Sequence, residues 1–153
     1  PNASQYDVNL IAILSPDSTN CGNNVSPKIL IRNDGIDALT SITFNYGTNG
    51  NIGSSFNWSG NLQGGDTTTI ILPSAGVLPQ GTNNLMVTAT NPNSSTDGNQ
   101  SNNSQQVNFT NNQDCLAYPN PFRNELTINF EIEKTNNKPV EVFFSLSVVA
   151  TIK

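Results

Sequence analysis

Short runs of alternating apolar and polar residues recur along most of this chain. Ile42, Phe44 and Tyr46 alternate with polar residues, so their side chains point to one face of an extended strand. Clusters of Asn, Gly, Ser, Thr and Pro separate the runs and favour turns. The pattern predicts seven strands, at residues 6–13, 28–32, 41–46, 54–58, 67–72, 84–90 and 105–109.

The spacing of these strands indicates the class of fold. Turn signals recur every 8 to 15 residues or so, which is typical of immunoglobulin-like and fibronectin-like sandwiches. We therefore predict an all-β protein: an immunoglobulin/fibronectin-like antiparallel β-sandwich of about seven strands at residues 1–114, followed by a partial second β-sandwich at residues 115–153. Turns are expected at residues 47–53 and at Asn33-Asp34-Gly35, where Gly35 is free to adopt a positive φ.

A stiff connector is predicted between the two parts. It consists of Tyr118, Pro119, Asn120, Pro121 and Phe122. Each proline fixes its own φ and holds the residue before it extended. An alternating strand follows at residues 126–132.

Composition excludes several functions. Only 11% of the residues are charged and the net charge is −5, so no basic surface attracts nucleic acid. No apolar run reaches the length of about 18 residues that a membrane span needs. The chain has no His, which removes the usual general base, and its acids are scattered, so we predict no catalytic residue and no enzyme.

The sequence also suggests two candidate ligand sites. Tyr46, Phe56 and Trp58 could stack on sugars if they were exposed on one sheet, although the single Trp is better explained as part of the core. The oxygen-rich stretch with Asn93, Asp97 and Asn99 reads first as a hairpin loop and second as a weak calcium site. We predict no other cofactor.

The sandwich region resembles the CARDB-type adhesion modules of bacterial surface and secreted proteins. The resemblance rests on Cys21, Val25-Ser26-Pro27, Ile29 to Gly35, Leu39-Thr40-Ser41, Tyr46, Trp58 to Leu62, Gly81 and Asn102-Asn103. It implies a module placed between another region of the same parent protein and a cell-surface sorting domain. The N-terminus, Pro1-Asn2-Ala3-Ser4, has no initiator Met, which also leads us to expect an upstream domain.

The stretch from Tyr118 to Phe122 and the strand after it resemble the opening of the type A C-terminal sorting domain of proteins exported by the type IX secretion system of Bacteroidota. This resemblance implies a protein secreted to the outer-membrane exterior, with the secretion machinery and then cell-surface lipopolysaccharide as partners. The apolar run at residues 140–152 lacks the expected Gly-containing turn, so the tail is either truncated or diverged. A plain Pro-rich linker is the alternative for a motif this short.

Cys21 and Cys115 lie near opposite ends of the predicted sandwich. An even number of cysteines in an exported β domain favours one disulfide, and two buried free thiols are the alternative.

Two functions therefore compete. The first is a non-catalytic spacer or adhesion module joined to a secretion signal. The second is a carbohydrate-binding or adhesive module in its own right, with polysaccharide as its partner.

Overall fold

The computed structural model describes residues 4–112, and within this range nearly all of its regular secondary structure is β-strand. The eight strands are β1 (Val8–Ser15), β2 (Thr19–Cys21), β3 (Lys28–Asn33), β4 (Leu39–Thr48), β5 (Asn51–Leu62), β6 (Thr67–Ile71), β7 (Gly81–Thr90) and β8 (Ser104–Asn112). Two single-turn 3-10 helices, η1 (Pro92–Ser94) and η2 (Gln100–Asn102), connect β7 to β8. No helix in this range is long and apolar enough to cross a membrane.

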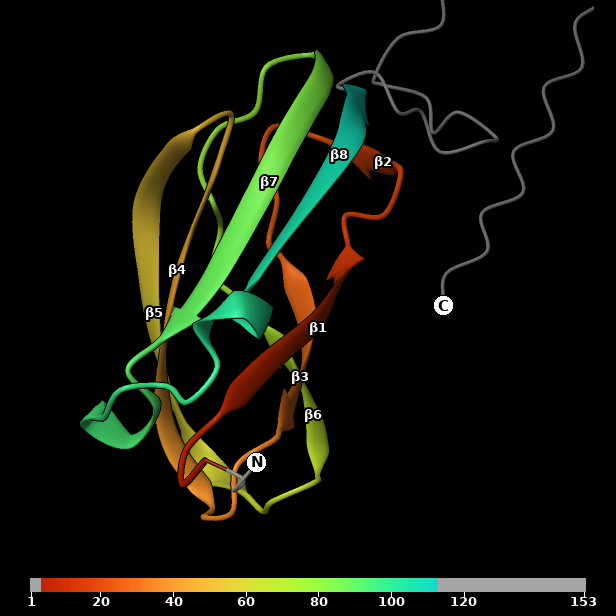
Figure 1. Ribbon diagram of the computed structural model, residues 1–153. Coiled ribbons are helices and arrows are strands. Elements are labelled where there is room, and N and C mark those ends of the chain that lie inside the picture. Colours follow the sequence, from red (N-terminus) through yellow and green to blue (C-terminus); the bar gives the residue numbers. More distant parts are fainter. Residues whose placement is uncertain (1–3, 113–153) are drawn as a thin grey trace, which may run out of the picture. The chain divides into compact units, whose positions relative to one another are not determined.

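The strands form two facing sheets (Figure 1). One sheet has three strands in the order β1-β3-β6, and the other has five in the order β2-β8-β7-β4-β5. All pairs are antiparallel except β2 with β8, which is parallel. The predicted β-sandwich is thus confirmed, with one parallel pair at its edge.

The core lies between the sheets and comes from the alternating positions that the sequence pattern marks. Ile42, Phe44 and Tyr46 of β4 are at most 1% exposed. They face buried side chains of the three-stranded sheet, among them Leu10, Ile29 and Ile31. Because alternate side chains of a strand point to opposite faces, the residues between them lie on the outer surface.

All seven predicted strands are present, and the structure adds β2. This strand has only three residues, Thr-Asn-Cys, and none of the alternation that identifies longer strands. The predicted turn at residues 47–53 is narrower than expected. Asn49 and Gly50 alone connect β4 to β5, with φ of 54° and 80°. Positive φ at both residues is the geometry of a two-residue hairpin turn, which lengthens both strands.

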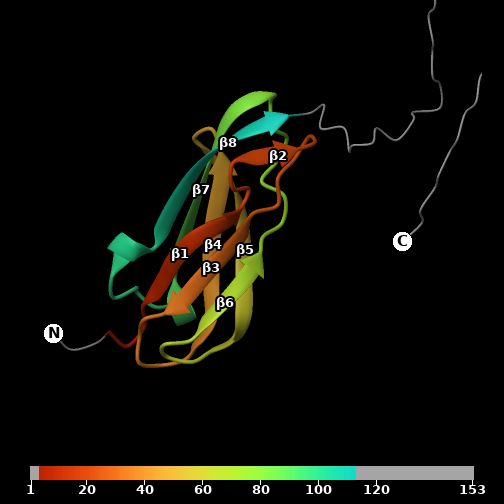
Figure 2. The same ribbon diagram turned by 90° about the vertical axis from the view of Figure 1, so that its right-hand side faces the viewer.

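The described chain enters at one end of the sandwich and leaves at the other (Figures 1 and 2). At the entry, the backbone N–H of Gly98, in the connection before β8, donates to the carbonyl oxygen of Tyr6 at 2.9 Å. At the exit, Asn112 ends β8. A strand of nine residues spans about 30 Å. The module therefore separates whatever precedes it from whatever follows it.

Candidate functional site

The connection between β7 and β8 is the most elaborate loop of the described chain, and Asp97 anchors it. Its side chain is 8% exposed. One carboxylate oxygen accepts a hydrogen bond from the backbone N–H of Val8, and the other accepts one from that of Asn99, both at 2.8 Å. The first bond ties the loop to the start of β1, which is 89 residues away in the sequence.

Asn93 fixes the other half of this loop. Its side-chain oxygen accepts from the backbone N–H groups of Thr40 and Ser41 at 2.7 and 3.2 Å, and its amide donates to the carbonyl oxygen of Ala38 at 2.8 Å. These hydrogen bonds satisfy backbone groups at the beginning of β4, which extends beyond the last residue of β7. Asn93 thus replaces a strand partner at that point.

These contacts bear on the predicted calcium site. The Asn93 side chain is hydrogen-bonded to the start of β4, and the Asp97 side chain is hydrogen-bonded to the start of β1. The two side chains therefore belong to separate hydrogen-bond networks. Asn99 contributes its backbone N–H to Asp97. Within residues 4–112 no three Cys, Asp or Glu residues are grouped so as to hold a metal ion. Calcium binding stays a prediction.

Two shallow hollows lie on either side of the loop and share Asn91. The first has a volume of about 280 Å³, and the residues around it include Thr88, Thr90 and Asp97. The second has a volume of about 440 Å³, and Thr43 and Asn57 are among its lining residues. Hydroxyl and amide groups are frequent in both linings, but they do not dominate them: Ala89 borders the first hollow, and Ile42 and Trp58 border the second.

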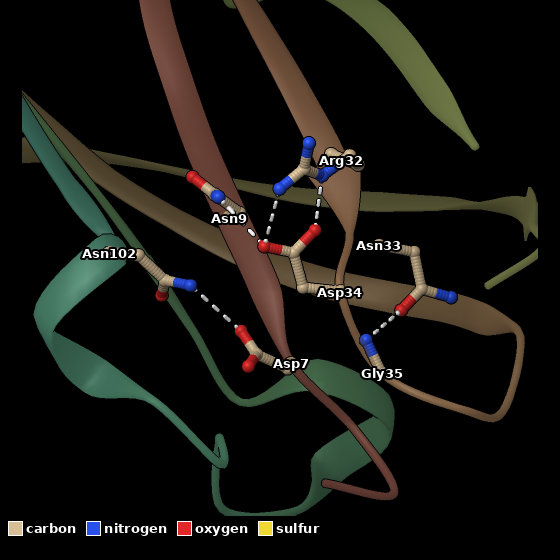
Figure 3. A network of polar contacts seen from close by, with 7 residues as sticks. All are labelled: Asp7, Asn9, Arg32, Asn33, Asp34, Gly35 and Asn102. Carbon is tan, nitrogen blue, oxygen red and sulfur yellow. Dashed lines mark hydrogen bonds and ion pairs between the residues drawn. The ribbon is translucent and has the colours of Figure 1, made fainter. Parts of the chain in front are cut away.

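The Asn33-Asp34-Gly35 turn lies in a second polar network at the same end of the sandwich (Figure 3). Asp34 pairs with Arg32 and accepts a hydrogen bond from the Asn9 amide at 2.8 Å. The side-chain oxygen of Asn33 accepts from the backbone N–H of Gly35 at 2.9 Å, which closes the turn. The predicted turn is confirmed.

The reason that we gave for Gly35 is wrong. Gly35 is not among the residues with positive φ. Instead, a Cβ at this position would lie 2.7 Å from the carbonyl oxygen of Gln5 and 2.8 Å from the backbone nitrogen of Asp7. The glycine is required because the segment before β1 passes directly over the turn.

The two acids of this network have pKa values shifted in opposite directions. Burial raises the pKa of Asp7, and the negative charges of Asp97 and Asp34 raise it further, against a lowering by the hydrogen bond from Asn102. The hydrogen bond from Arg32 lowers the pKa of Asp34, and the Asn9 amide adds to this effect. Both directions are relative to the ordinary pKa of an Asp carboxyl group, 3.8.

The opposite shifts predict opposite effects of pH on stability. The stabilisation from ionised Asp34 is present above its ordinary pKa and is lost as the pH falls through its lower folded value. The ionised form of Asp7 is disfavoured by folding, so its cost is present above its raised pKa and disappears at lower pH. We expect Asp34→Asn to lose about 1 kcal/mol or less of unfolding free energy near neutral pH, and Asp7→Asn to lose none or to gain.

Urea unfolding of both variants and the parent protein, at about pH 7 and about pH 2.5, tests this expectation. At the acidic pH the differences between the three proteins should shrink. If Asp7→Asn were the less stable variant at neutral pH, the assignment of a destabilising charge to Asp7 would be wrong.

The three aromatic residues proposed for ligand stacking lie on the inner face of the five-stranded sheet. Phe56 pairs with Phe44 and Trp58 with Ile42, and both partners are buried. Tyr46 is 1% exposed, so its predicted role as a stacking surface is wrong.

Phe56 and Trp58 are half-buried and pack against the core, as expected for Trp58. A Cβ at Gly60 would collide with the Trp58 indole, so the ring lies along β5 over this glycine. Ligand contact by Phe56 or Trp58 stays a prediction.

The other predicted site residues lie partly or wholly outside the described range. Cys21 ends β2, opposite Asn112 of β8, but Cys115 is outside it. The stretch from Tyr118 to Phe122 is outside it as well. The disulfide, the sorting motif and the boundary between the two predicted domains therefore stay predictions.

Sequence reasoning missed the structural asparagines. Asn33, Asn83, Asn103 and Asn111 are at most 4% exposed. Asn111, for example, donates to the carbonyl oxygen of Pro79 at 3.1 Å and accepts from the Asn20 amide at 3.0 Å. The chain is rich in Asn, so its sequence offers one signal for a buried asparagine. That signal is an Asn in a predicted strand, on the same face as apolar residues two positions away.

Two facing, mostly antiparallel sheets around one core define this part of the chain as an immunoglobulin-like β-sandwich. Neither a protein-family model nor a curated protein matches the chain.

Solved structures show a closer likeness. The chain is similar to the crystal structure of a CARDB domain from Pyrococcus furiosus, in complex with di-metal ions, at 16% identity over 72% of this chain and 97% of that one, with a TM-score of 0.56. The solution structure of that domain is similar at 18% identity over 71% and 96%, with a TM-score of 0.53. A domain of a Methanosarcina acetivorans protein, named for the cell surface, is similar at 17% identity over 69% and 91%, with a TM-score of 0.56. The chain therefore has a CARDB-like fold.

Proposed function

We propose that this chain is a non-catalytic part of a secreted or surface-attached bacterial protein, in which the sandwich is a spacer and adhesion module and residues 115–153 begin a type IX sorting signal. The observation that carries the spacer role is the separation of entry and exit. The start of β1 and the end of β8 lie at opposite ends of the sandwich (Figure 1), so the module adds its length between an upstream domain and the segment after it. No catalytic residue and no cofactor are part of this proposal.

Similarity of fold supports the surface location. One of the similar structures comes from a protein named for the cell surface. The surface of the described domain suits a role outside the cell, because amides and hydroxyls supply most of its polarity. After export, we propose cell-surface lipopolysaccharide as the site of attachment and the type IX machinery as the partner during export.

The geometry of β2 supports a disulfide between Cys21 and Cys115. Cys21 lies opposite Asn112 in the parallel β2–β8 pair, although 91 residues separate the two in the sequence. Cys115 follows Asn112 by three residues, which span at most about 10 Å when extended. This short separation supports the proposed pairing of the two cysteines, and an oxidising exterior would preserve the bond.

A secretion assay tests the sorting role of Tyr118 to Phe122. In a type IX-competent Bacteroidota host, a periplasm-directed fluorescent reporter is fused to residues 111–153, with a matched Pro119→Ala/Pro121→Ala partner. We expect the first fusion at the cell surface or in the medium and the second in the periplasm. Retention of both fusions in the periplasm would leave the motif as a rigid linker.

A further inference from the structure

Charge is distributed unequally between the two sheets. No strand of the five-stranded sheet contains a Lys, Arg, Asp or Glu residue. The charged residues of the described range all lie on β3 or in loops: Asp7, Asp17, Lys28, Arg32, Asp34, Asp37, Asp66 and Asp97. The outer face of the larger sheet therefore offers neutral groups alone.

The hydroxyl and amide groups on this outer face are held in fixed positions by one another. Thr43 donates to the side-chain oxygen of Asn57 at 2.9 Å, across β4 and β5. Asn45 donates to the Thr90 hydroxyl at 3.2 Å, which itself donates to the carbonyl oxygen of Thr43 at 3.1 Å. Each amide retains a free N–H or a free lone pair after these bonds, so it can still bind a ligand.

The two hollows beside the β7–β8 connection open next to this face. Thr43 and Asn57 line one, Thr90 lines the other, and Asn91 lines both. Asp97 is the one charged lining residue, and backbone N–H groups already occupy both of its oxygens. Volumes of about 280 and 440 Å³ suit ligands of the size of one or a few sugar rings.

The ridge between the hollows has an unusual backbone. Asn91, Asn93 and Ser94 have φ of 52°, 50° and 60°. Non-glycine residues rarely adopt this region, and the surrounding structure must hold them there. The bonds of Asn93 to β4 do so, which makes Asn93 a positioning residue for Asn91 and Ser94.

We propose that this surface, from Asn57 across Thr43 and Asn91 to Thr90, binds a neutral polysaccharide. Fixed neutral donors and acceptors match a chain of sugar hydroxyls, and neither the surface nor the net charge of −5 favours an anionic polymer. Tyr46 is buried and Phe56 borders neither hollow, so Trp58, which borders the second one, is the one proposed stacking residue that can add to these hydrogen bonds. The inference adds a ligand to the proposed surface module and is independent of the sorting signal.

Affinity electrophoresis of the full chain through gels that contain dextran, galactomannan, xylan or mixed-linkage β-glucan tests the proposal, with alginate as the anionic comparison. At least one neutral polymer should retard the protein. Asn57→Ala should weaken that retention about fivefold, which corresponds to the loss of one hydrogen bond. The matched control is Asn108→Ala, on the same outer face but outside both hollows, and it should bind like the parent.

Nuclear magnetic resonance of the unmodified chain supplies a second measurement that needs no variant. The polymer that causes retardation, cut to oligosaccharides, should shift the resonances of Thr43, Asn57, Thr90 and Asn91. Retardation by none of the neutral polymers, retardation by alginate alone, equal losses in the two variants, or shifts elsewhere would each overturn the proposal.

Discussion

Replacement of Cys21 by serine should lower the free energy of unfolding of this protein by about 4 kcal/mol. A Cys21–Cys115 disulfide closes a loop of about 95 residues, and the chain-entropy estimate for a loop of that length is about 4 to 5 kcal/mol. Reduction of the parent protein should have the same effect. The free energy, measured by guanidinium unfolding with and without a phosphine reductant, is the test.

Two controls make the result specific. The Cys21→Ser variant should not respond to the reductant, because it has no bond left to break. Titration of thiols in the unfolded, unreduced parent should find none. If two thiols react and the reductant changes nothing, the cysteines are free and the disulfide proposal fails.

The proposed disulfide would also stabilise the end of β8, where the described chain leaves the sandwich. β2 has three residues and pairs with β8 alone among the strands of its sheet. So short a pairing stabilises little by itself. A covalent bond beside it would hold the end of β8 together where tension from a surface attachment would be applied. Amide hydrogen exchange at Thr110 and Asn111 should therefore quicken on reduction more than exchange in β4.

The sequence predicts the strands and their buried faces well wherever apolar and polar side chains alternate. Ile42, Phe44 and Tyr46 form one buried row as expected, and Leu85, Val87 and Ala89 form another. The residue types of a turn are less informative about why each residue is needed, because contacts with segments distant in the sequence decide this. Gly35 illustrates this limit: the turn was predicted, but the glycine is needed for a segment that passes over it.

The candidate site was the least predictable part. In the antiparallel β4–β7 pair, β7 ends at Thr90 opposite Thr43, so the first residues of β4, from Leu39, extend beyond it, and the hollows lie beside this offset. The offset depends on the register of the whole sheet. The sequence predicted that Asn93 and Asp97 supply oxygen ligands for calcium. It contained no sign that their side-chain oxygens accept hydrogen bonds from the backbones of different strands. In an Asn-rich chain, a structural asparagine and a solvated one look the same until the fold is known.

Asn33→Ala should be the most damaging substitution of a single polar side chain, at about 3 kcal/mol of unfolding free energy, because buried backbone groups left without partners each cost about 1 to 3 kcal/mol. Asn33 is fully buried. Its amide donates to the carbonyl oxygens of Asp37 and Leu62, and its oxygen accepts from the Gly35 N–H, all at 2.9 Å. Alanine would remove all three bonds from one interior position.

Asn61→Ala is the matched control, since Asn61 is exposed and bonds to the exposed Gln63 side chain. It should change stability by no more than about 0.5 kcal/mol. Asn33→Asp separates hydrogen bonding from size, because it retains the acceptor for Gly35 but turns a second oxygen toward two carbonyl groups. It should therefore be as damaging as alanine. Equal stability of the Asn33→Ala and Asn61→Ala proteins in urea would show that water replaces the lost bonds and that the turn does not depend on Asn33.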